Sequence, residues 1–343
     1  ASADWIAPKP WLAVKRLTRI RSTRTLAPVL LAHSSIMKPP SDSDVSAAFC
    51  QLIDPSTKIS EVRSVGGGCI SSAMQITLHD DRLGNRTVFA KANEPGFIDN
   101  FQSECDCLIA LAEAESILIP KPLAVGTAAE RAWLVTEWVE TRPQAKNFFT
   151  DFGRQLAKLH QVTAGSQIGW SSDNFLGSAI QPNTATAGWA EFVAENRIGF
   201  QLRWALDQHR ADAKLRRDGE AIIAAMPELL SGRAAETSLL HGDLWSGNYL
   251  CGATGDAAGG VPVIIDPAVY YGCREAEFGM LKLFGSCPPE FYDAYQATWP
   301  LPDGWQHRIN VYVLYHLLNH LNLFGSGYLG QCHQVASEIL RSK

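Results

Sequence analysis

The stretch LLHGDLWSGNYL, residues 239–250, constrains this chain more than any other. Two leucines lead into His, Gly and Asp, and Asn248 follows Asp243 by five positions. A second apolar run, VII, ends at Asp266. Each polar residue also has a purely structural interpretation: Asp243 as a helix cap, Asn248 in a turn, and Asp266 before Pro267 as the start of a loop.

Three further features precede this stretch in the chain. Glycines 66–68 separate two predicted strands, where backbone N–H groups can face an anion, although such a turn is often only a hairpin. Lys91 lies in the strand VFAKAN, where a solvated edge position is the alternative. Glu104 lies on the predicted helix at 100–114, where it could equally be an exposed acid.

Taken in order, these residues predict phosphoryl transfer from ATP. Asp243 would accept the proton of the substrate hydroxyl, and Asn248 and Asp266 would hold Mg²⁺. Lys91, paired with Glu104, would hold the phosphates. The spacing of Asp243 and Asn248 equals that of the protein-kinase catalytic loop, and DPA stands where a kinase has DFG.

The periodicity of the chain predicts an α+β, protein-kinase-like fold with two lobes. Residues 42–140 read as a small antiparallel β-rich lobe with one helix, which would bind the nucleotide. Residues 141–343 read as a larger, mainly helical lobe carrying catalysis and substrate binding, with two short β runs at 238–240 and 261–265. A continuous helix is expected over 189–209.

The composition and net charge of the chain limit the classes of partner that it is expected to bind. The chain of 343 residues is 46% hydrophobic, enough for a sizeable core. A net charge of -5 gives no electrostatic reason to expect nucleic acid, and no apolar run approaches the roughly 20 residues of a membrane-spanning helix. A small-molecule or protein substrate is expected.

Residues 1–41 differ in charge from the rest. They carry seven Lys or Arg and one acid, against 23 basic and 34 acidic residues elsewhere. A segment rich in Arg, Ser and Thr and poor in acids is typical of an organelle transit peptide, with a disordered basic arm as the alternative. A plastid address is expected, with mitochondrion or cytoplasm as alternatives.

With these features the chain resembles the fructosamine (ketosamine) kinases. They are a branch of the kinase-like fold that also includes aminoglycoside and choline kinases. The likeness runs from about residue 45 to the C-terminus and rests on GGGC, LLHGDLWSGN, DPAVYYGCREAEFGM and YHLLNHLNLFGSGY. It implies ATP- and Mg²⁺-dependent phosphorylation of the sugar 3-hydroxyl of free or protein-bound ketosamines, which repairs glycated protein. The plant-type members imply ribulosamines and erythrulosamines, with fructosamine possible.

The resemblance also places further residues. Backbone groups of Glu137, Trp138 and Val139 would meet adenine. Trp245 is a candidate for stacking on the sugar, or else a core aromatic, and Asn174 is a weaker substrate candidate. The family also often places a Cys where this chain has Cys69.

The eight cysteines show no metal-ligand or disulfide-framework spacing, which favours free thiols. Cys69 directly follows Gly66, Gly67 and Gly68, where backbone N–H groups would favour its thiolate, so it is a candidate redox switch in a monomer or a redox-dependent homodimer; a neutral filler is the alternative. Cys105 and Cys107 are predicted packing residues.

His316 and His320, four apart, are expected to line the large lobe as satisfied histidines rather than to share a metal. Two rival functions remain at this stage. One is a kinase of the same fold for another small alcohol, such as an aminoglycoside or a sugar. The other is a redox-responsive nucleotide-binding pseudokinase, against which the complete residue set argues.

Overall fold

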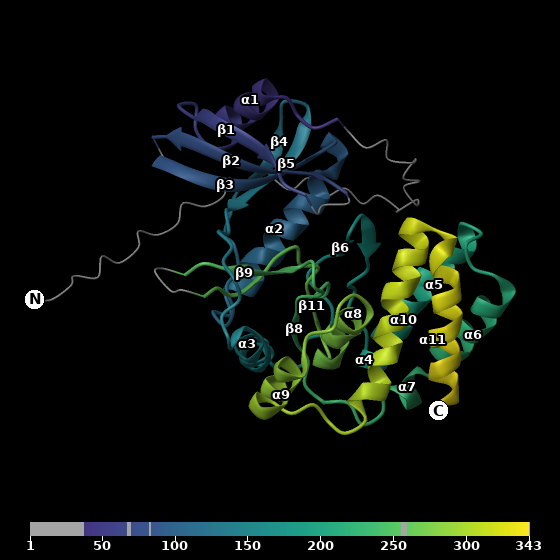
Figure 1. Ribbon diagram of the computed structural model, residues 1–343. Helices are drawn as coiled ribbons and strands as arrows, with labels where there is room; N and C mark the ends of the chain where they lie inside the picture. The colour runs from purple at the N-terminus through teal and green to yellow at the C-terminus, as the bar shows by residue number, and fades with distance from the viewer. Residues whose placement is uncertain (1–37, 67–69, 82–83, 255–258, 343) are drawn as a thin grey trace, which may run out of the picture. The chain divides into compact units, whose positions relative to one another are not determined.

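A five-stranded antiparallel sheet with strand order β1-β2-β3-β5-β4 forms the first part of the structure (Figure 1). The structure is a computed structural model that describes residues 38–66, 70–81, 84–254 and 259–342. Two helices accompany the sheet. The elements are α1 (Asp42–Leu52), β1 (Lys58–Ser64), β2 (Ser72–Asp80), β3 (Gly84–Asn93), a 3₁₀ turn (Pro95–Phe97), α2 (Ile98–Ala112), β4 (Pro122–Ala128) and β5 (Arg131–Glu137).

Helix α1 begins at a capping box and covers one face of the sheet. The Ser41 hydroxyl accepts from the Asp44 N–H, and the Asp44 carboxylate accepts from the Ser41 N–H at 2.9 Å. Its apolar side buries Val45 and Phe49, and the Phe49 ring meets the edge of Trp133 of β5. This packing fixes the helix against the central strands.

Helix α2 joins two hydrophobic cores. Phe101 and Cys105, on its N-terminal half, pack against Leu134 of β5. Leu108 and Leu111, one to two turns later, belong to the core of the helical part of the chain. A residue on this helix between the two groups is therefore held from both sides.

The remaining chain is mainly helical and contributes most of the buried apolar side chains. Its helices are α3 (Phe148–Val162), α4 (Trp189–Phe192), α5 (Phe200–Asp207), α6 (Ala213–Ala224), α7 (Met226–Leu229), α8 (Glu277–Leu283), α9 (Pro289–Thr298), α10 (Trp305–Phe324) and α11 (Leu329–Arg341). A π-helix (Val193–Gly199) lies between α4 and α5, and 3₁₀ turns lie at Arg274–Ala276 and Ser326–Tyr328. Across the described residues, none of the helices has the length and apolar character needed to cross a bilayer.

Three small antiparallel pairs are set into this helical part. They are β6 (Asn174–Leu176) with β7 (Ala179–Gln181), β8 (Ser238–Leu240) with β11 (Tyr270–Gly272), and β9 (Tyr249–Gly252) with β10 (Val261–Ile264). Strand β8 is wholly buried and leads directly into His241, Gly242 and Asp243. Strand β10 leads toward Asp266 in the same way. Two short strand ends therefore present the polar residues singled out in the sequence.

The architecture confirms the predicted α+β, kinase-like fold with a β-rich and a helical part. The sequence analysis assigned no strand to β4, which begins with Pro122 at the edge of the sheet, a position where Pro is tolerated. It also missed helix α9, which starts with Pro289 at its first position. The helix expected over 189–209 is present but widens to a π-helix in its middle.

Helices α3 and α9 approach closely at Gly153. A Cβ at that position would collide with the backbone carbonyl of Phe291, which cannot move aside as a side chain could. We expect Gly153→Ala to lower the melting temperature by roughly 2–8 °C, the effect of ~1–3 kcal/mol of overpacking, although Ala favours helix in general. Gly327→Ala, which has no atom within 4 Å of its added Cβ, is the matched control and should not lower it. Equal melting temperatures for both variants would contradict this account.

Candidate functional site

One ammonium group links the sheet, helix α2 and the strand-end loop. Lys91, on the central strand β3, contacts Glu104 Oε1 at 2.7 Å and Asp266 Oδ1 at 2.8 Å. The Lys91 and Glu104 side chains are only 13% and 18% exposed. The predicted Lys91–Glu104 pair therefore forms, and the structure adds Asp266 to it.

The protonation of this trio follows from burial and charge. Burial lowers the pKa of Lys91, but the carboxylates of Asp266 and Glu104 outweigh it and raise the pKa, so the ammonium persists. Burial raises the pKa of Glu104 to about 7 against the attraction of Lys91. A lysine held charged and aimed by two carboxylates suits a phosphate-holding role.

The backbone of the loop that follows β8 is held by Glu277, the first residue of α8. The Glu277 carboxylate accepts from the His241 N–H at 2.7 Å and the Gly242 N–H at 3.1 Å. Burial alone would raise the pKa of Glu277, but its contact with His160 Nε2 at 3.5 Å, its attraction to His241 and its bond from the His241 N–H lower the pKa. An ionised carboxylate beneath two backbone N–H groups fixes where Asp243 stands.

Gly242 and His241 tie this loop to the neighbouring one. Gly242 has φ +81°, and a Cβ there would collide with the carbonyl oxygen of Ala268, so only glycine fits. The Ala268 N–H donates to the His241 carbonyl at 2.9 Å. His241 Nε2 bonds the Ile265 carbonyl at 2.8 Å, one residue before Asp266. His241 and Glu277 both lie inside motifs of the sequence, but no local pattern indicated a role for either residue.

Asp243 carries the carboxylate that the sequence predicts as the base. The Asn248 amide nitrogen donates to the Asp243 carbonyl at 2.8 Å and to Asp243 Oδ2 at 3.1 Å. The other oxygen, Oδ1, is buried and has no hydrogen-bond partner among the residues that the structure describes. Burial, and then repulsion from Asp266, raise the pKa of Asp243 well above its ordinary value. Such a carboxylate is a stronger base than one in water.

The oxygens of Asn248 and Asp266 fit a magnesium ion. Because the Asn248 nitrogen faces Asp243, its Oδ1 is the atom left to ligate a cation. The Asp266 side chain is 41% exposed. Within the described ranges, no three His, Cys, Asp or Glu side chains gather as a metal site. Mg²⁺ needs only one or two such protein oxygens when phosphates and water complete its shell.

Other predicted nucleotide-binding residues are placed less completely. Gly66 follows β1 and is exposed. Gly67, Gly68 and Cys69 lie outside the described residues, so the phosphate cradle and the redox switch stay predictions. Glu137 ends β5, its N–H bonds the Lys121 carbonyl at 2.9 Å, and Trp138 and Val139 follow in the connection to the helical part. Their contact with adenine also stays a prediction.

Trp245 lies two residues beyond Asp243 in a strip of aromatic rings. Its ring meets Phe284 at 6.1 Å between centroids, and Phe284 meets His320 at 4.6 Å. The His320 ring continues to Phe324 at 5.3 Å and Tyr328 at 5.2 Å. The sequence analysis missed Phe284, Phe324 and Tyr328, although the quoted C-terminal motif contains the last two. The strip presents a run of aromatic rings that begins two residues after Asp243.

The two histidines of α10 have separate roles. His316 is 2% exposed, and burial lowers its pKa to about 3, so it stays neutral. His320 Nδ1 bonds the His316 carbonyl at 2.8 Å. Contrary to the expectation of two satisfied histidines, His316 Nδ1 has no hydrogen-bond partner.

The remaining predicted residues are buried. The seven described cysteines are unpaired, and burial raises the pKa of Cys105 and of Cys107 to about 12, as expected for packing residues. Asn174 is 1% exposed, and its amide bonds protein groups near residue 269 rather than facing an open surface.

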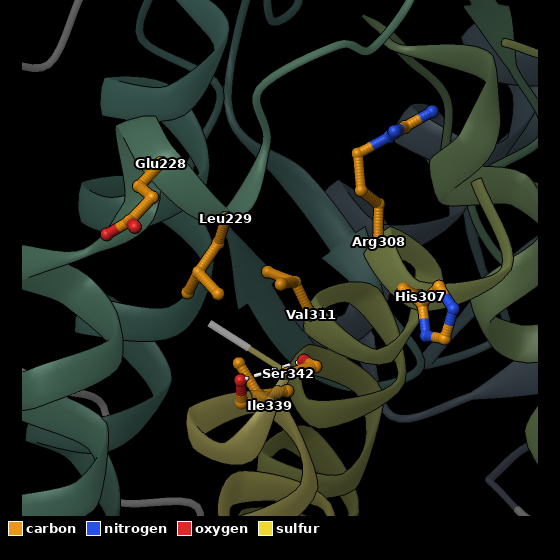
Figure 2. A pocket seen from close by; sticks show the side chains of 7 residues that line it. All are labelled: Glu228, Leu229, His307, Arg308, Val311, Ile339 and Ser342. Carbon is orange, nitrogen blue, oxygen red and sulfur yellow. Dashed lines mark hydrogen bonds between the residues drawn. The ribbon is translucent and has the colours of Figure 1, made fainter. Parts of the chain in front are cut away.

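A small cavity lies elsewhere, between α7, α10 and α11 (Figure 2). Leu229, Val311 and Ile339 line it, and the Arg308 guanidinium is committed to Glu275 at 2.7 Å. None of the residues predicted for the site lines this cavity.

Comparison with known proteins gives consistent matches. The family model described as fructosamine kinase matches residues 41–342. A probable ketoamine kinase of Synechocystis is 40% identical over 83% of this chain and 92% of its own. The chloroplastic protein-ribulosamine 3-kinase of Oryza sativa subsp. japonica is 38% identical over 83% of this chain and 80% of its own.

Solved structures agree. The crystal structure of a putative fructosamine-3-kinase from Thermobifida fusca has a TM-score of 0.75 and 30% identity, covering 88% of this chain and 100% of that one. An aminoglycoside phosphotransferase in complex with AMP-PNP and hygromycin B has a TM-score of 0.57 at 15% identity, covering 83% and 95%, which shows a shared fold alone.

The buried, unpaired oxygen of Asp243 predicts a stability cost. A carboxyl with a raised native pKa destabilises the fold at a pH above that pKa, and this cost shrinks as the pH falls from there toward the ordinary pKa of the unfolded chain. We expect Asp243→Asn to raise the melting temperature of the ligand-free protein by about 2–4 °C at neutral pH. The gain should shrink as the pH is lowered, in thermal melts from about pH 8 to 5. A gain that does not change with pH, or a lower melting temperature, would contradict the proposed electrostatics.

Proposed function

Because this chain belongs to the fructosamine kinase family, we propose that it transfers the γ-phosphoryl group of ATP to the sugar 3-hydroxyl of a ketosamine. The observation that carries the proposal is the convergence of Asp243, Asn248 and Asp266 beside Lys91. These residues come from three separate parts of the chain. Together they supply a base, hard oxygen ligands and a phosphate-holding cation.

Each residue has a defined task in the reaction. Asp243 accepts the proton of the attacking hydroxyl, and the hydrogen bond from Asn248 to Oδ2 leaves Oδ1 as the accepting atom. Lys91, aimed by Glu104, holds the phosphates in line with that hydroxyl. Asn248 Oδ1 and the Asp266 carboxylate would hold Mg²⁺. When bound, Mg²⁺ neutralises charge on the transferring phosphates.

We propose that the aromatic strip beginning at Trp245 receives the sugar and its amine. Sugar C–H faces pack on aromatic rings, and the half-buried Trp245, two residues after Asp243, meets the half-buried Phe284. The names of the rice and Thermobifida relatives, a ribulosamine 3-kinase and a putative fructosamine-3-kinase, support a ketosamine with its 3-hydroxyl as acceptor. Ribulosamine is the preferred substrate in this proposal.

The test is a substrate panel read by mass spectrometry. With Mg·ATP, ribulosyl-lysine should gain one phosphoryl group, about 80 Da, faster than fructosyl-lysine, whereas free ribulose and an aminoglycoside should not. Asp243→Asn should lower turnover roughly 100- to 10,000-fold and still bind ATP, because only the base is lost. Phosphorylation of the aminoglycoside but of neither ketosamine would favour the rival small-alcohol kinase. Absence of any product with bound ATP would favour the pseudokinase.

We also propose that residues 1–41 direct the protein to plastids. The basic, acid-poor composition of this segment and the chloroplastic relative from rice support this address. A fluorescent protein carrying residues 1–41 at its N-terminus should accumulate in the plastids of plant cells. The same reporter with the seven Lys and Arg of this segment replaced by Gln should remain outside. Accumulation of the first reporter in mitochondria or cytoplasm would contradict the proposal.

A further inference from the structure

A cluster of buried polar side chains lies against the loop that carries Asp266. None of its members has a direct part in the proposed reaction. It is called the amide network here and is nearly inaccessible, with exposures from 0% to 2%. Its members are Asn174, Gln181, Asn183, Arg197 and Tyr315.

The amide network grips two successive carbonyls of that loop. Asn174 Nδ2 donates to the Val269 carbonyl at 2.7 Å, and Gln181 Nε2 donates to the Ala268 carbonyl at 3.0 Å. Ala268 is also the residue whose N–H bonds the His241 carbonyl. The segment just after Asp266 is thus fixed on one side by β8 and on the other by two amides.

Arg197 determines which way these amides point. A guanidinium can only donate, so Asn183 must turn its oxygen to Arg197, at 2.9 Å. The Asn183 nitrogen then donates to Asn174 Oδ1 at 2.8 Å, which leaves the Asn174 nitrogen for Val269. Tyr315 donates its hydroxyl to Gln181 Oε1 at 2.9 Å and sets the second amide in the same sense. The amide nitrogens of Asn174 and Gln181 are therefore both directed toward the loop.

Arg197 is an expensive residue for a core. It is 2% exposed, and among the ion pairs of the described residues none involves it. Its charge lies instead over the rings of Phe192 and Tyr270, at 4.5 and 4.2 Å. It belongs to the π-helix Val193–Gly199, a rare form that is frequently found at functional sites. A network of neutral side chains would fill the same space at a lower cost.

The loop has a reason to need such a grip. Asp266 has φ +56°, a left-handed conformation that is strained for a residue other than glycine. Strained residues persist only where the surroundings hold them. The neighbouring residues Ala268 and Val269 are the ones that the network holds.

We propose that the amide network is a positioning device that keeps Asp266 in the conformation that binds the metal ion. This inference rests on the proposed function, because it takes Asp266 as a ligand of Mg²⁺. Asn174 then acts through the loop rather than on the substrate. Its loss should weaken the metal-dependent part of nucleotide binding more than the metal-independent part.

The chain supplies its own control for a purely structural role. Gln201, Asn319 and Asn322 form a second buried amide cluster that does not bond the loop. Asn322 Nδ2 donates to the Gln201 carbonyl at 2.9 Å, much as Asn174 Nδ2 donates to that of Val269. The two asparagines are 2% and 1% exposed. Asn174→Leu and Asn322→Leu therefore each remove one buried amide-to-carbonyl hydrogen bond, from Val269 and Gln201 respectively, and Asn174→Leu also removes the oxygen that accepts from Gln181 and Asn183.

The experiment measures binding rather than turnover. The dissociation constant of ADP is determined by calorimetry with Mg²⁺ and with EDTA, and Mn²⁺ binding in the presence of ADP is followed by electron paramagnetic resonance. In Asn174→Leu we expect the Mg²⁺-dependent gain in ADP affinity to fall about tenfold, with ADP binding in EDTA changed less than about twofold. Asn322→Leu should keep the wild-type gain at a comparable loss of melting temperature. Equal gains in the two variants would overturn the positioning role.

A milder pair guards against misfolding. Tyr315→Phe removes the hydroxyl that orients Gln181, and Tyr312→Phe removes an equally buried hydroxyl that accepts from Trp189 Nε1 at 2.9 Å. Only Tyr315→Phe should reduce the Mg²⁺-dependent gain, by about two- to fivefold. A wild-type protein in which Mg²⁺ gives no gain would overturn the proposed metal site together with this inference. A normal wild-type gain, unchanged by Tyr315→Phe and Asn174→Leu, would overturn the inference alone.

Discussion

The structure depends on the buried ammonium of Lys91, which lies between the carboxylates of Glu104 and Asp266. The three residues belong to the sheet, to α2 and to a loop of the helical part, so one cation joins all three. Burying charge is costly, and it is tolerated here because each charge has an opposite neighbour. Helix α2 makes this possible by packing against both cores, and Glu104 lies in the part of the helix that packs against the sheet, between Phe101 and Cys105.

Other buried polar groups hold the backbone on either side of Asp243 and Asp266. Glu277 holds the backbone of the loop before Asp243, and the amide network holds the backbone after Asp266. The Asp243 oxygen that would accept a proton is left without a partner, and Asp266 is left in a strained conformation. Asp243 and Asp266 thus lower the stability of the fold, and Glu277 and the amide network stabilise the backbone that carries them.

Sequence reasoning was strongest where the chemistry lies in one short segment. Asp243 and Asn248 are five residues apart, and their hydrogen bond confirms that the spacing brings them together. It was weaker where a role depends on a distant partner. The bond from Asn174 to Val269 spans 95 residues, and no local pattern in either segment indicates it. The π-helix within 189–209 was likewise invisible, because apolar periodicity does not distinguish it from a regular α-helix.

The sequence by itself determined the kind of reaction, the order of the lobes and the identity of the groups that carry charge. These follow from local spacing and from strand and helix periodicity, which act over a few residues. Only the tertiary structure decided that Lys91 contacts Asp266 as well as Glu104, that Glu277 anchors the loop before Asp243, and that Asn174 is buried against the segment after Asp266. The physical reason is that these contacts form only when distant segments of the chain pack together. The local sequence of either segment does not predict which side chain of the other it will meet.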